Sequence, residues 1–122
     1  MNLTPSDMAT SMIQAERTLL WTNPSPTSSF GAQTVSLDLS HYDSIEIEYV
    51  MQAQYQVSIF AHASVGVSAY LFGAAGGNYA RQITITTTGV QFAAGIYYAA
   101  YGGGGAQTNN TVLVPIRIYG IK

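Results

Sequence analysis

The sequence predicts an all-β protein, an antiparallel and jelly-roll-like β-sandwich of about eight strands with a short helix before it. Three observations predict this class. Apolar and polar residues alternate in several segments, short turns separate these segments, and helical spacing is confined to the first 16 residues. Strands do not alternate with helices along the chain, so a parallel sheet is not expected.

The chain has 122 residues, enough for one domain, and we place a helix or stalk stub at 1–16 and the sandwich at 17–122. Only 8% of the residues are charged, against about 25% in a typical domain. Arg81 is the only full charge between Tyr49 and Ile116. So little charge predicts either a homo-oligomer or a sheet surface made of Thr, Ser and Gln.

Composition also argues against several partners. The net charge is −2, and a domain that binds nucleic acid is usually basic. No apolar run reaches about 18 residues, so we expect no membrane insertion. The N-terminus lacks the basic and apolar segments of a signal peptide. There is no cysteine, so thiols do not indicate a redox compartment.

Helical signals occur only in the segment 3–16. Thr4 can cap the helix and Pro5 suits its first turn. Positions 8, 12, 15 and 19 are apolar and follow the four-three-four spacing of a coiled-coil seam. We expect either a helix packed on its own domain or the stub of a fibrous stalk.

Three strands are expected in the first half of the chain. Segment 17–22 contains Trp21, the only tryptophan, which we expect to anchor the core. Segments 33–39 and 44–51 both alternate, and the turn at 40–43 lies between them. We therefore expect these two segments to form an antiparallel pair with one solvated face.

Glycine dominates the second half, where ten of the twelve glycines lie between Gly66 and Gly105. Strands are expected at 55–61, 64–72, 79–88 and 90–101, with a tight hairpin at Gly89. Segments 73–78 and 102–110 are expected to be loops.

The chain closes with TVLVPIRIYGIK at 111–122, in which Val or Ile at positions 112, 114, 116 and 118 should face the core. The intervening Leu, Pro, Arg and Tyr should form the other face. Pro115 has no N–H to donate, so this strand should lie at a sheet edge or contain a bulge.

No pattern for catalysis or metal binding is evident. The two histidines, His41 and His62, lack a metal-ligand spacing; we interpret His41 as a turn residue and His62 as half-buried. Glu46 and Glu48 share one strand face, whereas retaining glycosidases place two carboxyl groups about 5–5.5 Å apart across a cleft. We expect no enzymatic activity, no cofactor and no metal.

Aromatic and amide side chains next to the glycine-rich segments are the best candidates for a ligand site. Tyr rings offer flat apolar surfaces, and Asn and Gln offer fixed hydrogen-bond partners, the combination that carbohydrates require. Adjacent Tyr97 and Tyr98 must face opposite ways in a strand, so only one can join such a surface. The candidates are Asn78, Tyr79, Tyr98, Tyr101, Gln107 and Asn109. The alternative for each tyrosine is core or cross-strand packing.

Four segments carry a resemblance to a known family: LWTNP at 20–24, FGAQTV at 30–35, LDLS at 37–40 with Tyr42 and Asp43, and PIRIYGIK at 115–122. Together they resemble the C-terminal domain of tail-fibre-like, minor structural proteins of phages and prophages of gut and other Gram-positive bacteria. Members of that family often end in a similar Pro, apolar, basic, Ile-Tyr-Gly-Ile-Lys sequence. The segments frame 19–122, but 51–108 does not match, so no binding residue is carried over.

The resemblance implies a virion protein, a homotrimer at the tip of a tail fibre, made in the bacterial cytoplasm without a signal peptide. Such a tip binds a glycan or protein on the host surface and contacts other virion proteins. The alternative is a purely structural virion protein, such as a head fibre, capsid decoration or connector, without receptor binding. A glycan depolymerase is a third hypothesis, which the residues support least.

Overall fold

The structure is a computed structural model that describes residues 17–51, 55–74, 77–99 and 105–122. The helix or stalk stub expected at 1–16 lies outside the described residues. Within them the protein is all-β, with ten strands in two antiparallel sheets and no helix.

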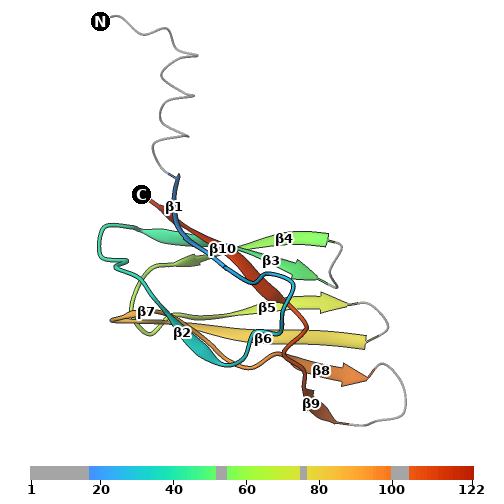
Figure 1. Cartoon of the computed structure of the whole chain (residues 1–122). Coiled ribbons are helices and arrows are strands. Elements are labelled where there is room, and N and C mark those ends of the chain that lie inside the picture. Colours follow the sequence, from blue (N-terminus) through green and yellow to red (C-terminus); the bar gives the residue numbers. More distant parts are fainter. Residues whose placement is uncertain (1–16, 52–54, 75–76, 100–104) are drawn as a thin grey trace, which may run out of the picture.

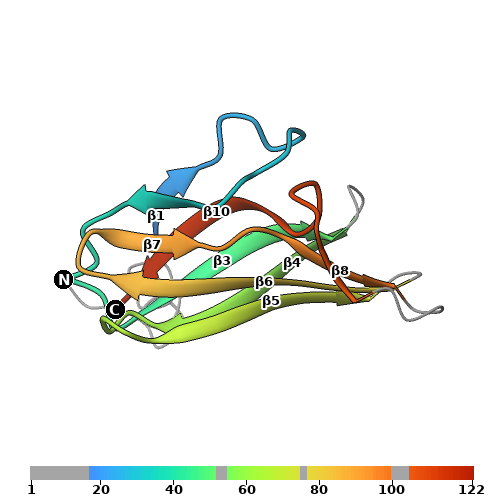
Figure 2. The ribbon, with the colours of Figure 1, turned by 90° about the horizontal axis from the view of Figure 1, so that it is seen from below.

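The strands form two layers (Figure 1), which Figure 2 shows after a quarter turn. Sheet A has the order β1 (Arg17–Thr22), β10 (Val114–Ile121), β3 (Ser44–Met51) and β4 (Tyr55–His62). Sheet B has the order β2 (Gln33–Ser36), β7 (Gly89–Phe92), β6 (Gly77–Thr86), β8 (Ile96–Ala99) and β9 (Ala106–Thr108), with β5 (Ser68–Ala74) also paired with β6.

One apolar core lies between the sheets. Ile45 and Ile47 of sheet A and Ile83 and Ile85 of sheet B belong to a single buried cluster. Because successive side chains of a strand point to opposite faces, every second residue of these strands reaches the core. This face-to-face packing is the arrangement of a β-sandwich, as predicted.

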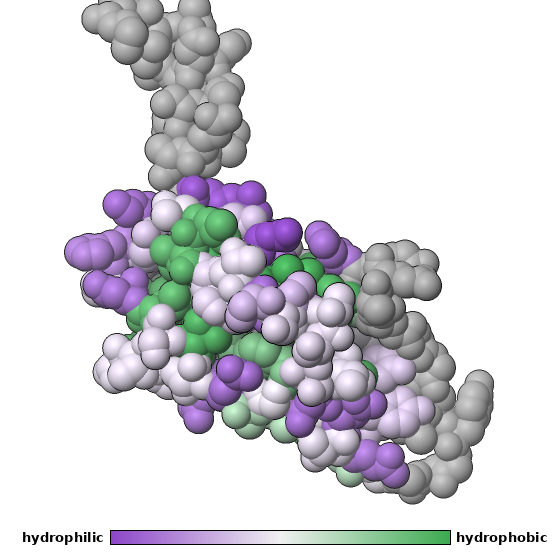
Figure 3. Space-filling model, viewed as in Figure 1, coloured by the Kyte–Doolittle hydropathy of each residue, from purple (hydrophilic) through white to green (hydrophobic). Residues whose placement is uncertain are grey.

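Aromatic rings close the core at the β1–β2 side. The ring of Phe30 meets the ring of Phe92 edge to face at a centroid distance of 5.3 Å and the ring of Trp21 at 6.1 Å. Trp21 itself is only partly buried, so it packs at the margin of the core. On the face drawn in Figure 3, apolar surface forms patches bordered by neutral and hydrophilic residues.

The order of the strands agrees with the jelly-roll expectation only in part. β1 pairs with β10, and β2 pairs with β7, as in a long hairpin rolled up on itself. β3, however, pairs with the next strand of the chain, β4, and β5 pairs with the next one, β6. The number of strands exceeds eight because the expected strand at 90–101 is interrupted after Phe92 and a short β9 follows it.

The expected pairing of segments 33–39 and 44–51 is wrong. β2 pairs with β7 in sheet B, whereas β3 lies between β10 and β4 in sheet A. The turn at 40–43 therefore crosses from one sheet to the other. Both segments alternate because both face the same core, from opposite sides, and alternation alone does not distinguish a crossover from a hairpin.

The closing strand β10 is a central strand, not an edge strand. It lies between β1 and β3, and its register with β3 shifts between Pro115 and Arg117. The bulge offered as the alternative is thus confirmed. Leu113, expected on the outer face, is fully buried, because its left-handed backbone (φ 50°) turns its side chain into the core.

Gly89 forms the hairpin that the sequence predicts. Thr86 and Gly89 are register partners, so two residues connect β6 to β7. At Gly89 φ is +145°, and a Cβ atom there would lie 2.1 Å from the carbonyl oxygen of Val35 in the neighbouring strand β2. Only glycine fits this close approach of two backbones.

The two glycine-rich segments contain more strand than expected. Gly73 and Asn78, assigned to a loop, lie in β5 and β6, and the pairing of these strands extends to Ala74 opposite Asn78. Residues 106–108, also assigned to a loop, form β9. The small residues allow close packing here: a Cβ at Gly73 would lie 2.7 Å from the sulfur of Met51 in β3.

Arg81 is the one buried cation among the described residues, and its exposed fraction is 0%. Its guanidinium donates to the carbonyl oxygens of Phe30 at 2.8 Å, Ala93 and Val112 at 2.9 Å, and Leu113 at 3.1 Å. A longer contact of 3.5 Å reaches Asn110. Arg81 thereby ties together three connecting segments that are distant in sequence. Burial lowers the pKa of Arg81 to about 10, so the group is charged at neutral pH.

Candidate ligand-binding surface

An open hollow of about 770 Å³ lies on the outer face of sheet B, the face turned away from sheet A. Its lining consists of Tyr70, Phe72, Gly73, Asn78, Ala80 and Tyr98. These residues come from β5, β6 and β8, at the end of the sheet where these three strands lie side by side.

Strand alternation brings the aromatic side chains to this face. In β5, Leu71 points into the core, so its neighbours Tyr70 and Phe72 point outward. In β6, Arg81 and Ile83 point inward. Asn78 and Ala80, which have the opposite parity in this strand, therefore point outward.

Cross-strand register then assembles the hollow. Phe72 lies opposite Ala80 and Asn78 lies opposite Tyr98. Ala80 is the short residue of this row and forms its floor, since its small side chain leaves the space between the larger neighbours open.

The aromatic rings are accessible and are also held in place. The exposed fractions are 63% for Phe72, 49% for Tyr70 and 42% for Tyr98. The rings of Tyr70 and Phe72 are nearly parallel, with centroids 5.6 Å apart.

Behind them, the hydroxyl group of buried Tyr49 in sheet A donates to the carbonyl oxygen of Phe72 at 3.1 Å. Burial raises the pKa of Tyr49, so its hydroxyl stays protonated at neutral pH. This bond fixes β5 against the core at the position that presents Phe72.

Of the six residues predicted from the sequence, Asn78 and Tyr98 lie together in the hollow as cross-strand partners. Tyr79 faces the other way, where its ring stacks on that of Tyr97 at 5.3 Å. The prediction that Tyr97 and Tyr98 face opposite ways is therefore confirmed. Tyr101 lies outside the described residues.

The remaining two predicted residues lie away from the hollow. Gln107 is the register partner of Tyr97, so its side chain is on the opposite face of sheet B from Tyr98. Asn109 uses its side-chain oxygen within its own turn, where it accepts hydrogen bonds from the backbone N–H of Thr111 and from the Thr111 hydroxyl.

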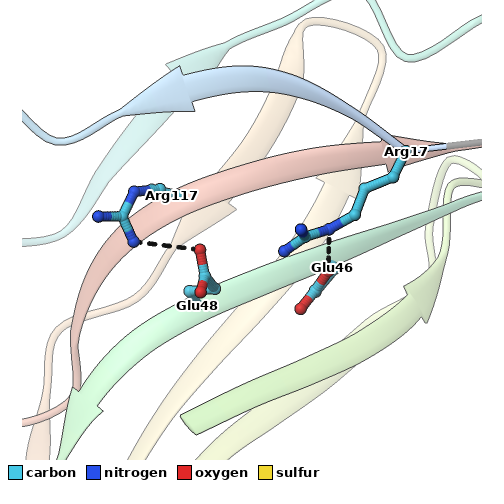
Figure 4. Close-up of polar contacts among 4 residues, drawn as sticks. All are labelled: Arg17, Glu46, Glu48 and Arg117. Atoms are coloured by element: carbon cyan, nitrogen blue, oxygen red, sulfur yellow. Dashed lines mark hydrogen bonds and ion pairs between the residues drawn. The ribbon is translucent and has the colours of Figure 1, made fainter. Parts of the chain in front are cut away.

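Outside sheet B, the outer face of sheet A carries the charges. Arg17 Nε lies 2.9 Å from Glu46 Oε1, and Arg117 Nη1 lies 3.2 Å from Glu48 Oε1 (Figure 4). Glu46 is thus paired with an arginine of β1, which lies two strands away across β10, and Glu48 with an arginine of the adjacent strand β10. The two carboxylates lie along one strand of an open sheet face, which is not the arrangement of two acids across a cleft.

No match to known proteins was found. Models of protein families do not match this chain, and neither curated proteins nor solved structures do. Within its described part, the chain has no group of three or more His, Cys, Asp or Glu residues placed to hold a metal ion. No helix in that part is long and apolar enough to cross a membrane.

Tyr70 and Phe72 are the members of the site that the sequence reasoning missed. They lie in β5, which precedes the glycine-rich segments, and the alternation of this strand carries the signal that they share one face. In SAYLFGA, the two rings flank Leu71 at positions of equal parity. A strand with aliphatic residues on one face and aromatic residues on the other has a core side and an accessible side.

The interpretation of His62 as a half-buried residue is wrong, since this residue is exposed.

Proposed function

We propose that this protein is a non-catalytic adhesion domain that binds glycan through the hollow on sheet B. The observation that carries the proposal is the cluster of Tyr70, Phe72 and Tyr98 around a small floor, with the Asn78 amide beside it. Apolar rings stack on the faces of sugars, and an amide next to them hydrogen-bonds sugar hydroxyl groups. The family resemblance of its framing segments supports the more specific proposal of a phage tail-fibre tip that attaches to the host surface.

The direct test compares two equally exposed phenylalanines. Phe72 lines the hollow, and Phe60 lies on sheet A, and each has an exposed fraction of 63%. Phe72→Ala should abolish retention on immobilised bacterial surface polysaccharide, and Tyr98→Ala should weaken it at least tenfold. Phe60→Ala is the matched control and should leave binding unchanged.

Equal binding by Phe72→Ala and wild type would refute the proposed site. Failure of the wild-type protein to bind any host cell or isolated polysaccharide would refute the function. The unfolding temperature of each variant should be measured alongside, so that loss of binding is not confused with loss of fold.

A second candidate, a purely structural virion protein, is favoured by the uncharged end strands of the two sheets. β4 and β5 are the end strands of their sheets, and the stretch 55–74 that contains them has no charged residue. Phe60 and Val65 are exposed there. Uncharged end strands with exposed apolar residues readily pair with another chain, which suits subunit packing.

Native mass in solution separates the two candidates when it is combined with the binding assay. A homotrimer that binds polysaccharide supports the fibre tip. A stable oligomer without affinity for any host surface supports the structural role. A monomer would refute the trimeric tip and would leave a single lectin-like module.

A further inference from the structure

The two sheets differ sharply in charge. The strands of sheet B contain one charged residue, Arg81, and its side chain is fully buried in the core. The outer face of sheet B is therefore uncharged throughout its described part. The charged side chains of sheet A, by contrast, form the two ion pairs on its own outer face.

Neutral hydrogen-bonding groups occupy sheet B beyond the hollow. Ser68, Thr84, Gln91 and Thr34 are successive register partners across four strands. The hydroxyl groups of Ser68 and Thr84 lie 3.1 Å apart, and Gln91 and Thr34 are exposed. Hydroxyl and amide groups both donate and accept hydrogen bonds, as sugar hydroxyl groups do.

From this separation of charge we infer that the ligand of the hollow is an uncharged polysaccharide, and that its binding does not depend on ionic strength. This inference rests on the proposed function and narrows its ligand class. Anionic polymers of the bacterial surface, such as teichoic acids and polyuronates, are excluded as ligands of this face.

The available cations explain the exclusion. An anionic polymer needs Lys or Arg within reach, because carboxylates and phosphates lose much hydration on binding. The guanidinium of Arg81 is directed to backbone carbonyls on the inner side of the sheet. Arg17 and Arg117 are paired with glutamates on the other sheet. Lys122, the remaining cation, follows β10 of that sheet, and its ammonium lies 5.9 Å from the centroid of the Tyr42 ring. Without a charge on the binding face, salt has no ion pair to screen.

The test compares neutral with anionic polymers, of which dextran and dextran sulfate share one backbone and differ only in charge. Wild-type protein is run by affinity electrophoresis through gels that contain dextran, mannan or galactan as neutral polymers, or dextran sulfate or polygalacturonate as anionic ones. Each run is made at low salt and at roughly ten times that ionic strength, which shortens the screening length about threefold. We expect retention by at least one neutral polymer that changes less than twofold with salt, and none by the anionic polymers.

Three outcomes are then distinguishable. Retention by a neutral polymer that Phe72→Ala abolishes supports the inference. Retention by an anionic polymer that weakens with salt overturns the inference and leaves the proposed adhesion intact. No retention by any of these polymers overturns the inference, whereas the proposed function is refuted only if the wild-type protein also fails to bind host cells and their isolated polysaccharides.

A charge-gain variant adds an internal check. Thr84→Lys places a cation on the uncharged row, and Thr84 is partly exposed. This variant should gain salt-sensitive retention by dextran sulfate at unchanged unfolding temperature. Equal retention of the variant and of wild type by dextran sulfate would show that the missing charge does not set the ligand class.

Discussion

Replacement of Arg81 by methionine tests the reasoning about the core most directly. Methionine is an unbranched apolar side chain that fills part of the same space without the charge or the donors. In the wild-type protein, the Arg81 guanidinium donates hydrogen bonds of 2.8–3.1 Å to four carbonyl oxygens. The variant leaves these four oxygens without that donor. These carbonyls belong to the segments around Phe30, Ala93 and Val112–Leu113, which should loosen together.

The expected loss follows from two opposing terms. An unsatisfied buried carbonyl costs about 1–3 kcal/mol, so four of them cost roughly 4–12 kcal/mol. Removal of a buried cation returns several kcal/mol of desolvation free energy. The difference is a destabilisation of about 3–5 kcal/mol, as when one partner of a buried charged group is removed. For a domain of this size the unfolding temperature should fall by roughly 10–20 °C.

The assay is thermal and urea unfolding followed by circular dichroism and tryptophan fluorescence. Arg117→Met is the matched control, because Arg117 is 36% exposed at the side chain and forms a surface ion pair with Glu48. The control should lose no more than about 1 kcal/mol.

Arg81→Lys sharpens the test. An ammonium group is a compact donor that cannot reach carbonyls spread around a planar guanidinium, so this variant should lose nearly as much stability as Arg81→Met. A loss below about 1 kcal/mol in Arg81→Met, or full stability in Arg81→Lys, would refute the role assigned to the guanidinium fork.

Three further predictions concern the hairpin, the hollow and the carboxylates. Gly89→Ala should destabilise the fold by about 1–3 kcal/mol in urea unfolding, because its Cβ would meet the carbonyl of Val35; wild-type stability would contradict the close approach. Ala80→Leu should fill the hollow and abolish polysaccharide retention while the unfolding temperature stays within about 2 °C of wild type; unchanged retention would place the ligand elsewhere. No reducing sugar should be released from host polysaccharide, and release that disappears in a Glu46→Gln/Glu48→Gln double variant would instead establish catalysis.

Much of the strand pattern was predictable because side chains alternate with the same period as the strand. Segments 17–22 and 44–51 match β1 and β3 residue for residue. Where glycine and alanine replace the alternation, the prediction lost accuracy: the strand at 64–72 begins later, at Ser68, and the one at 90–101 is interrupted after Phe92. Small residues carry little information about which face is buried.

Pairing and site assembly were less predictable than the strands. No local pattern shows that β2 and β3 belong to opposite sheets, because the apolar residues of both strands alternate toward the same core. Pro115 indicated a bulge. The central place of strand β10, however, depends on its pairing with β1 and β3, which are distant from it in sequence. Asn78 and Tyr98 were found by residue type, whereas Phe72 joins them only through the register of three strands.

The position of β10 has a consequence for how the chain folds. β10 lies far along the chain from both of its partners, since Ile121 pairs with Arg17 of β1 and with Ser44 of β3. Sheet A therefore cannot close until β10 has been synthesised and has left the ribosome, and until then β1 and β3 each lack a neighbour. Such long-range pairing belongs to the slow-folding class of topologies. Removal of β10 would accordingly delete an inner strand of sheet A and leave β1 without its partner.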